Sequence, residues 1–377
     1  MRKLLLICPA VALVAFLAVR SAPADPPSAT APAATRPDNL DADWAPMRPI
    51  VPRGYVCRRA AGPVTVDGKP DEPAWADAPW TDDFVDIEGS RRPNPRFRTR
   101  AKMLWDDAGF YVYAELEEPH VWGTITRRNQ VIFHDNDFEV FVDPDGDNHN
   151  YYEFEMNALN TVWELSLDKP YRDGGPARDP GPLAGLRSAV HVNGTLNAPG
   201  DTDRSWSVEV AFPWAALKPY AGARACPPGD GDQWRVNFSR VEWLVDIIDG
   251  KYRKIPKEMR AEDNWVWSPQ GAVDMHRPER WGYVQFSSSA ATADFRPDPA
   301  LAARDAVMGA YHRQQAYRKQ AGRYAASAAE LGLAADARPA VEVTATPNGF
   351  NATSTLKLPD GSARTARVRE DSKLTVE

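Results

Sequence analysis

The chain has 377 residues, with 45 Lys and Arg against 52 Asp and Glu, a formal net charge of −7 and 26% charged residues. This is the balance of a soluble globular protein. A net acidic chain is a poor candidate for nucleic-acid or anionic-membrane binding, because it has no basic surplus to neutralise phosphates. Strands and helices also do not alternate over the roughly 250 residues that a (β/α)₈ barrel needs.

The N-terminus predicts an export signal. Arg2 and Lys3 precede an apolar run over residues 4–19, and residues 22–24 (Ala-Pro-Ala) offer a cleavage site before Asp25. We therefore expect residues 1–24 to be a signal peptide and the mature protein to be secreted or periplasmic. A retained membrane anchor is the alternative, but the apolar run is shorter than the roughly 20 residues that a span needs.

Two cysteines lie outside the expected signal, Cys57 and Cys226. An exported protein folds in an oxidising compartment, so these two thiols are a candidate disulfide. Two separate buried thiols are the alternative.

Composition divides the rest of the chain into three parts. Residues 25–53 are rich in Pro and Ala without an apolar period, and they predict a flexible tether. Residues 54–289 hold all but one of the 13 tryptophans and form the expected main domain. Residues 290–377 predict a small α+β tail of unknown function. Its expected elements are one long or two broken helices over residues 300–333 and short strands over residues 340–344 and 354–358.

Apolar and polar residues alternate along the main domain with a period of two. In residues 137–143, for example, Phe138 and Val140 lie on one face of the expected strand and Glu139 on the other. The expected strands are residues 100–105, 110–117, 137–143, 151–159, 162–168, 206–212, 234–239 and 282–286. Many short strands without intervening helices predict a mainly β fold, an antiparallel β-sandwich of jelly-roll type.

The strand faces opposite the apolar ones carry carboxylates, amides and a guanidinium. If the strands are neighbours in one sheet, these side chains share a surface: Glu139, Glu155, Asn157, Glu209, Arg235 and Asn237. Such groups form hydrogen bonds with vicinal hydroxyls, and tryptophans supply stacking platforms for sugar rings. The pattern favours a carbohydrate-binding face. The alternative is that these residues pair with one another across strands, with Arg235 neutralising a glutamate.

Five segments of the main domain resemble, in order, the strands of the family 9 carbohydrate-binding modules and their DOMON-related β-sandwich relatives. They are residues 64–75 (VTVDGKPDEPAW), 103–114 (MLWDDAGFYVYA), 136–143 (NDFEVFVD), 206–214 (WSVEVAFPW) and 281–286 (WGYVQF). The resemblance implies an exported β-sandwich that binds oligosaccharides or polysaccharides of the xylan or cellulose type. It further implies that the chain is not itself an enzyme and serves carbohydrate catabolism beside a glycoside hydrolase partner.

The resemblance also implies individual site residues. Glu139 matches the glutamate that contacts the ligand in these modules, and Phe133 takes the place of the first of two tryptophans that enclose the sugar. Met275 or His276 falls at the second tryptophan. Glu155 stands where the family has an arginine, so the hydrogen-bonding pattern must differ here.

Trp265 and Trp267 lie two residues apart in the run Asn264 to Gly271, so on an extended loop they project to one side. They are either replacement platforms for the sugar or anchors of the loop. The complete candidate carbohydrate site is therefore Phe133, Glu139, Glu155, Asn157, Arg235, Asn237, Trp265, Trp267, Met275 and His276.

Asp143, Asp145 and Asp147 alternate in a turn that follows a strand. Oxygen ligands at alternate positions of a tight loop suit Ca²⁺, and the resemblance implies structural calcium. The run is not an EF-hand, because Asn148 stands in place of the glycine and Phe154 in place of the bidentate glutamate. A solvated Asp-rich turn is the alternative.

Three other functions stay open from the sequence. Glu139 and Glu155 could face each other as the carboxylate pair of a glycoside hydrolase. His276, with Met103 or Met156 as the second ligand, could bind haem as related DOMON sandwiches do. A non-enzymatic scaffold of an envelope assembly, with residues 290–377 as its contact surface, is the third.

Overall fold

The computed structural model describes residues 37–255, 262–289 and 293–377. The expected signal peptide, residues 1–24, and the first part of the expected tether lie outside these ranges. Within them, no helix combines the length and the apolar character that crossing a membrane requires.

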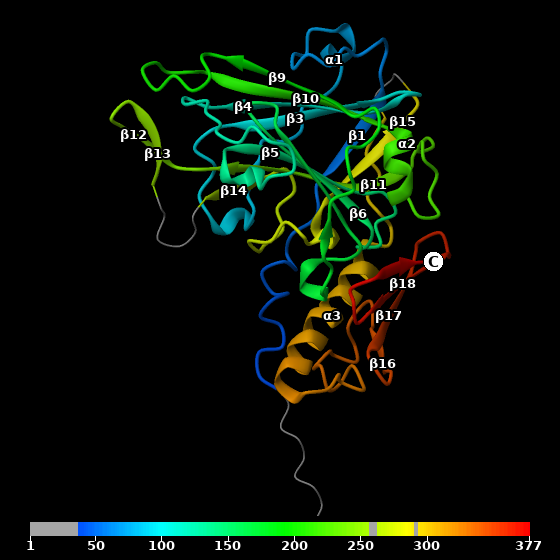
Figure 1. The fold of residues 1–377 in the computed structure, drawn as a ribbon. Helices are drawn as coiled ribbons and strands as arrows, with labels where there is room; N and C mark the ends of the chain where they lie inside the picture. Colours follow the sequence, from blue (N-terminus) through cyan, green and yellow to red (C-terminus); the bar gives the residue numbers. More distant parts are fainter. Residues whose placement is uncertain (1–36, 256–261, 290–292) are drawn as a thin grey trace, which may run out of the picture. The chain divides into compact units, whose positions relative to one another are not determined.

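Each of the eight predicted strands is confirmed, and they belong to one curled sheet (Figure 1). The strands of this sheet are β1 (Gly54–Arg59), β2 (Val85–Asp86), β3 (Thr99–Trp105), β4 (Gly109–Glu117), β5 (Asp137–Asp143), β6 (Tyr151–Asn157), β7 (Val162–Leu167), β8 (Ala177–Arg178), β9 (Arg187–Asn193), β10 (Ser205–Pro213), β11 (Gln233–Glu242), β14 (Asp263–Val266) and β15 (Gly282–Ser287). Their order along the sheet is β8-β7-β6-β5-β11-β15-β1-β3-β4-β10-β9, while β14 pairs with β11 and β2.

Strand β1 joins the two halves of the sheet. It pairs in parallel with both β15 and β3, whereas the other described pairs of the sheet are antiparallel. The predicted antiparallel β-sandwich is therefore confirmed in its architecture, and β1 is the exception within it.

The apolar strand faces meet in one core between the two halves of the sheet. Phe138 and Met156 come from the half that contains β5 and β6, and Val112 and Val210 come from β4 and β10 in the other half. All four side chains are fully buried. The period-two pattern thus fixes which face of each strand is covered by the opposite layer.

Short elements connect the strands. Helices α1 (Pro73–Ala76) and α2 (Trp214–Leu217) are single turns, and strands β12 (Val245–Ile248) and β13 (Lys251–Lys254) form a separate hairpin. The 3₁₀ helices are Gly89–Arg91, Ile132–His134, Tyr171–Asp173, Lys218–Tyr220 and Pro278–Arg280.

The C-terminal tail is one long helix on a small antiparallel sheet (Figure 1). Its elements are α3 (Leu301–Ala321), β16 (Glu342–Ala345), β17 (Phe350–Lys357), β18 (Ala363–Arg369) and β19 (Leu374–Val376). Helix α3 ends at Gly322, whose φ of 71° is in the left-handed region and whose N–H bonds to the Arg318 carbonyl. Glycine adopts this conformation at a helix end without the steric penalty of a Cβ atom.

The prediction of a flexible tether over residues 25–53 is wrong for residues 37–53, the part that the structure describes. Leu40, Trp44 and Met47 are at most 3% exposed and belong to one apolar cluster with α3 and the β16–β19 sheet. The Trp44 ring stacks on His312 at a centroid distance of 5.3 Å. Composition alone does not show these contacts, because the partners lie far away along the sequence.

The tail also contacts the main domain directly. Arg280, which precedes β15, pairs with Asp305 of α3, and the Asn148 amide donates to the Ser372 carbonyl at 3.0 Å. His312 of α3 lies 3.3 Å from the Glu279 carboxylate. Residues 37–377 accordingly form one compact unit, and the boundary expected at residue 290 does not separate two bodies.

The candidate disulfide is not formed. Cys57 and Cys226 are both free, with Cys57 fully buried in the sandwich core and Cys226 half-buried. The Cys226 thiol donates to the Trp214 carbonyl at 3.4 Å, so it is held on the α2 side of that core. The alternative of two separate thiols is what the structure shows.

We predict that Trp44→Ala lowers the free energy of unfolding by roughly 3–5 kcal/mol, because the substitution opens a cavity in the cluster that joins the N-terminal segment to α3. Urea unfolding, followed by circular dichroism, measures this change in the free energy of unfolding. Val51→Ala is the matched control, since Val51 is 72% exposed in the same segment. Equal stabilities of the two variants would restore the tether interpretation.

Candidate functional site

A row of cross-strand neighbours builds the polar face of the sheet. Glu139 of β5 lies directly opposite Glu155 of β6. Ser239 of β11 pairs with Glu139 on one side, and Trp163 of β7 pairs with Glu155 on the other. Since directly opposed residues project to the same face, all four side chains stand on the side away from the apolar core.

A cavity of about 280 Å³ opens over this row. Its floor includes Glu139, Glu153 and Glu155, and Met275 and His276 of the loop between β14 and β15 cover one side of it. The lining as a whole comes from Ile87, Phe133, Glu139, Phe141, Glu153, Glu155, Trp163, Leu165, Tyr171, Val241, Glu262, Asn264, Val273, Asp274, Met275 and His276. The strands therefore supply three acidic groups among apolar side chains, and the segments around them supply further apolar residues together with the acids Glu262 and Asp274.

Aromatic rings surround the cavity. Phe133 and Trp163 lie with ring centroids 6.3 Å apart and planes inclined by 33°, and the Tyr171 ring meets His276 edge-on at 4.4 Å. Tyr171 is 46% exposed, and Val273 at the same cavity is 52% exposed. These two belong to the few large apolar residues that the described chain leaves open to solvent, so the cavity offers uncovered apolar surface to a ligand.

His276 is held in one orientation at the wall of the cavity. Nδ1 forms a hydrogen bond with the Tyr151 hydroxyl at 2.9 Å, and Nε2 lies 3.9 Å from the Glu153 carboxylate. Burial lowers the pKa of His276 to about 4, against an ordinary 6.5. The imidazole is therefore neutral at physiological pH, and it presents an uncharged ring to the cavity.

Burial dominates the carboxyl groups of the floor. It raises the pKa of Glu139 to about 7 and, together with the charge of Glu139, raises the pKa of Glu153 to about 8. The pKa of Glu155 lies well above its ordinary value for the same reasons, burial first and then Glu139. Several acids thus share a site that disfavours full ionisation, as functional sites commonly do.

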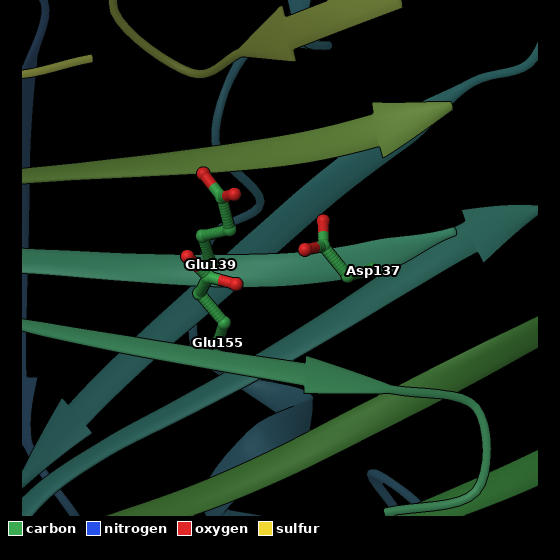
Figure 2. Close-up of side chains that lie close together, drawn as sticks. All are labelled: Asp137, Glu139 and Glu155. Atoms are coloured by element: carbon green, nitrogen blue, oxygen red, sulfur yellow. The ribbon is translucent and has the colours of Figure 1, made fainter. Parts of the chain in front are cut away.

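Asp137 extends the acidic row. It lies two residues before Glu139 on β5 and therefore on the same face, and Figure 2 shows its carboxylate beside those of Glu139 and Glu155. One carboxylate oxygen from each of these three residues lies within 4.8 Å of the others. Burial, followed by the charge of Glu139, raises the pKa of Asp137 well above its ordinary value. Asp137 is not among the residues predicted for the site.

Half of the predicted carbohydrate residues meet in this cavity. Phe133, Glu139, Glu155, Met275 and His276 line it. Three residues that were not predicted for the site also line it, Glu153, Trp163 and Tyr171. Glu153 and Trp163 could have been predicted from the sequence, because the strand pairing that brings Glu139 to Glu155 places both of them on the same face. No sequence signal identified Tyr171, which begins the 3₁₀ helix after β7.

Two predicted amide side chains, Asn157 and Asn237, form hydrogen bonds within the protein and do not line the cavity. Asn157 donates to the Ile125 carbonyl at 2.9 Å, and its oxygen accepts the Thr161 N–H at 3.0 Å. Asn237 donates to the Ser268 carbonyl and accepts the Ser268 N–H, both at 2.9 Å. Both side chains are fully buried, so these two predictions are corrected.

Arg235 lies on the predicted face but away from the cavity. Its guanidinium donates to the Trp281 carbonyl at 2.7 Å and covers the Tyr283 ring at 3.7 Å. It lines a different cavity, of about 270 Å³, together with Asp145 and Arg304. The expected neutralisation of a glutamate by Arg235 is not found among the described ion pairs.

Three further candidates do not reach the cavity, and for Trp265 and Trp267 the structure shows the alternative of anchors. Trp265 and Trp267 belong to the apolar core at 3% and 1% exposure, because residues 263–266 form β14 and pair with β11. They anchor the chain and stack no ligand. Glu209 lies on β10, in the other half of the sheet, where its carboxylate accepts the Trp75 indole N–H at 2.9 Å.

The structure does not place Met103 or Met156 where either could bind a haem iron together with His276. Met103 and Met156 are fully buried in the apolar core, on the opposite side of the sheet from His276. Met156 faces the core because it follows Glu155 on β6, and Met103 of β3 lies in the same core, so neither sulfur faces the cavity that His276 lines.

The predicted calcium residues do come together. One oxygen each of Asp143, Asp145 and Asp147 lies within 4.8 Å of the others. The Gly146 N–H donates to one Asp143 carboxylate oxygen and the Asn148 N–H to the other. The Lys373 ammonium lies 3.0 Å from the Asp147 carboxylate. The oxygen donors fit a hard cation, although the lysine already offsets one charge.

Comparison with known proteins gives a family match. Residues 66–226 match the model of the family described as "Carbohydrate family 9 binding domain-like". No curated protein matches the chain at a significant level. The matched range contains β3 to β10, and with them the acidic row and Phe133, but it ends before Met275 and His276.

Solved structures resemble the chain more loosely. A family 9 carbohydrate-binding module from Caldicellulosiruptor kristjanssonii in complex with cellotriose is 14% identical, with 66% of this chain and all of that chain covered and a TM-score of 0.40. A protein from Bacteroides uniformis, described as a candidate carbohydrate-binding protein, is 16% identical, with 63% and 100% covered and a TM-score of 0.46.

We predict that His276 makes the fold less stable in acid. Because its pKa is about 4 in the folded chain and 6.5 ordinarily, the unfolded chain binds the extra proton first as the pH falls between these values. Stability should be highest above this window and decrease through it. Relative to His276→Gln, the wild type should lose about 2.5 kcal/mol between neutral pH and about pH 4.5.

Denaturant unfolding of both proteins at the two pH values measures this difference. Any constant cost of the substitution, such as the lost hydrogen bond from Tyr151, cancels in the comparison. Identical pH dependences would show that His276 is not held neutral by burial.

Proposed function

We propose that this chain binds an oligosaccharide of the xylan or cellulose type in the cavity over β5 and β6, in keeping with the family 9 carbohydrate-binding match over residues 66–226. The observation that carries the proposal is the composition of that cavity. Acidic groups form its floor and aromatic groups its rim, as in sites that bind polyhydroxylated rings.

The aromatic rim suits the apolar faces of a pyranose. Phe133 and Trp163 are both half-buried, so part of each ring remains open toward the cavity. Tyr171 and Val273 extend this surface outward. A sugar placed here would remove apolar area from water without any rearrangement of the strands, because Trp163 is fixed on β7.

The acidic floor suits the hydroxyl groups. Oε2 of Glu153 and Oε2 of Glu155 are both buried and accept no hydrogen bond from the described residues. An acceptor without a partner costs free energy, and a sugar hydroxyl can donate to it. Glu139, between them and Ser239, completes a set of acceptors that fixes the orientation of a ring stacked at the rim.

The proposal extends to the setting in which the protein acts. We expect the chain to be exported by way of residues 1–24 and to serve carbohydrate catabolism beside a glycoside hydrolase. The matched family is a binding family and not a catalytic one. The calcium expected at Asp143, Asp145 and Asp147 stays a prediction.

One observation favours a second function. Oxygens of Glu139 and Glu155 lie within 4.8 Å of each other, which is closer to the spacing of a retaining glycoside hydrolase, about 5–5.5 Å, than to the wider spacing of an inverting one. Chromatography of the sugar after incubation with the protein distinguishes the two functions. We expect the oligosaccharide to remain intact.

We predict that Trp163→Ala lowers the affinity for xylo- or cello-oligosaccharides about tenfold, the equivalent of about 1.4 kcal/mol of lost stacking. Isothermal calorimetry on the full chain measures it. Trp80→Ala is the matched control, because Trp80 is also half-buried but packs against Tyr113 and Arg100 on other strands. Its affinity should equal that of the wild type.

Two results would contradict the proposed site. Either Trp163→Ala, shown to be folded, binds as the wild type does, or Trp80→Ala loses as much affinity. Absence of binding across a broad glycan panel by the folded wild type would favour the scaffold function instead.

A further inference from the structure

Three carboxylates converge beside the cavity (Figure 2), and two of them, Glu139 and Glu155, line it. Asp137 and Glu139 stand two apart on β5, and Glu155 faces Glu139 from β6. Both strands lie inside the sheet, with hydrogen-bonded neighbours on each side. The three groups are therefore held together by the backbone pairing and not by flexible loops.

The charge of this cluster has no counterpart among the described residues. Asp137, Glu139 and Glu155 are at most 4% exposed, yet none of them forms an ion pair with a lysine, arginine or histidine of residues 37–255, 262–289 or 293–377. The Val241 N–H, 3.0 Å from Asp137, is a donor to only one of the oxygens. Buried charges in proteins are otherwise paired or bound to a metal.

Buried oxygens without a hydrogen-bond partner provide a second, separate observation. Among the residues that the structure describes, Oδ2 of Asp137 and Oε2 of Glu155 have none. Neither has Oε2 of Glu153, which lies outside the cluster but lines the same cavity and is 3% exposed. Buried polar atoms are rarely left in this state. Three of them around one acidic cluster indicate a missing positive partner.

We propose that Asp137, Glu139 and Glu155 bind a divalent cation of the calcium class beside the cavity, at the side where Glu139 and Glu155 line it. Oxygens bound to Ca²⁺ lie about 2.3–2.6 Å from the ion, so two of them are at most about 5 Å apart. The mutual distances within 4.8 Å meet this limit. A ligand set made only of carboxylate oxygens selects a hard cation over zinc or copper.

The cavity leaves room for the remaining ligands. Calcium takes six to eight oxygens, more than these three side chains supply unless some of them bind through both oxygens. The space of about 280 Å³ above the cluster can hold water or a hydroxyl group of a bound molecule. The site goes beyond sugar binding and does not require it, because the cluster exists without a sugar.

The competing account is that the three carboxyl groups remain protonated and bind no metal. Calorimetry with CaCl₂ on the full chain, stripped with EDTA, separates the two. We expect the wild type to bind calcium and both Asp137→Asn and Glu155→Gln to bind it at this site about 100-fold more weakly. Asp145→Asn removes an acid from the other cluster and should leave this site unchanged.

Several results would overturn the proposal. They are no calcium binding by the folded wild type, unchanged binding by both Asp137→Asn and Glu155→Gln, or loss of all binding in Asp145→Asn. Thermal melting establishes that each variant is folded. If neither cluster variant folds, anomalous diffraction from wild-type crystals soaked in MnCl₂ decides, since a peak beside Asp137 supports the site and its absence overturns it.

Failure of the calcium proposal and failure of the carbohydrate proposal can be distinguished when calcium and glycan binding are measured on the same protein. Calcium bound at the cluster by a protein that binds no glycan would support this inference alone. Glycan binding that persists in EDTA, together with no calcium at the cluster, would support the carbohydrate proposal alone.

Discussion

The register between β5 and β6 is the constraint on which the rest of the molecule depends. Pairing Glu139 with Glu155 places Phe138, Met156 and their apolar neighbours on one face and the acids on the other. A slip of one residue would exchange the two faces and put carboxylates into the core. The fold therefore cannot form in this register without also assembling the acidic row.

The acidic face is also buried, and this makes it unusual. A polar strand face normally lies in water, where carboxylates cost nothing. Here the loop that carries Met275 and His276, the turn at Tyr171 and the 3₁₀ helix at Phe133 rise around it. The chain thus keeps uncompensated acids in a partly closed cavity, at a cost in stability that binding of hydroxyl groups or a cation offsets. Function, in this account, is what retains them.

Local sequence patterns predicted the strands. They did not predict features that depend on contacts between residues far apart in the sequence. Period two identified the strand that carries Glu139, because alternation is a property of neighbouring residues. The same rule failed for Trp265, since its strand β14 is short and its burial depends on β11. Trp44 was assigned to a tether because its partner His312 is far away in the sequence. Of the site, the acids followed from pairing, whereas Tyr171 depends on how a turn folds back.

The most direct test of the account is a crystal structure of the full chain with xylotriose or cellotriose. The account predicts sugar density in the cavity over β5 and β6, with one pyranose ring against Trp163 and hydroxyl groups within hydrogen-bond distance of Glu139 or Glu155. A sugar bound on another face of the molecule, with this cavity filled only by water, would contradict it.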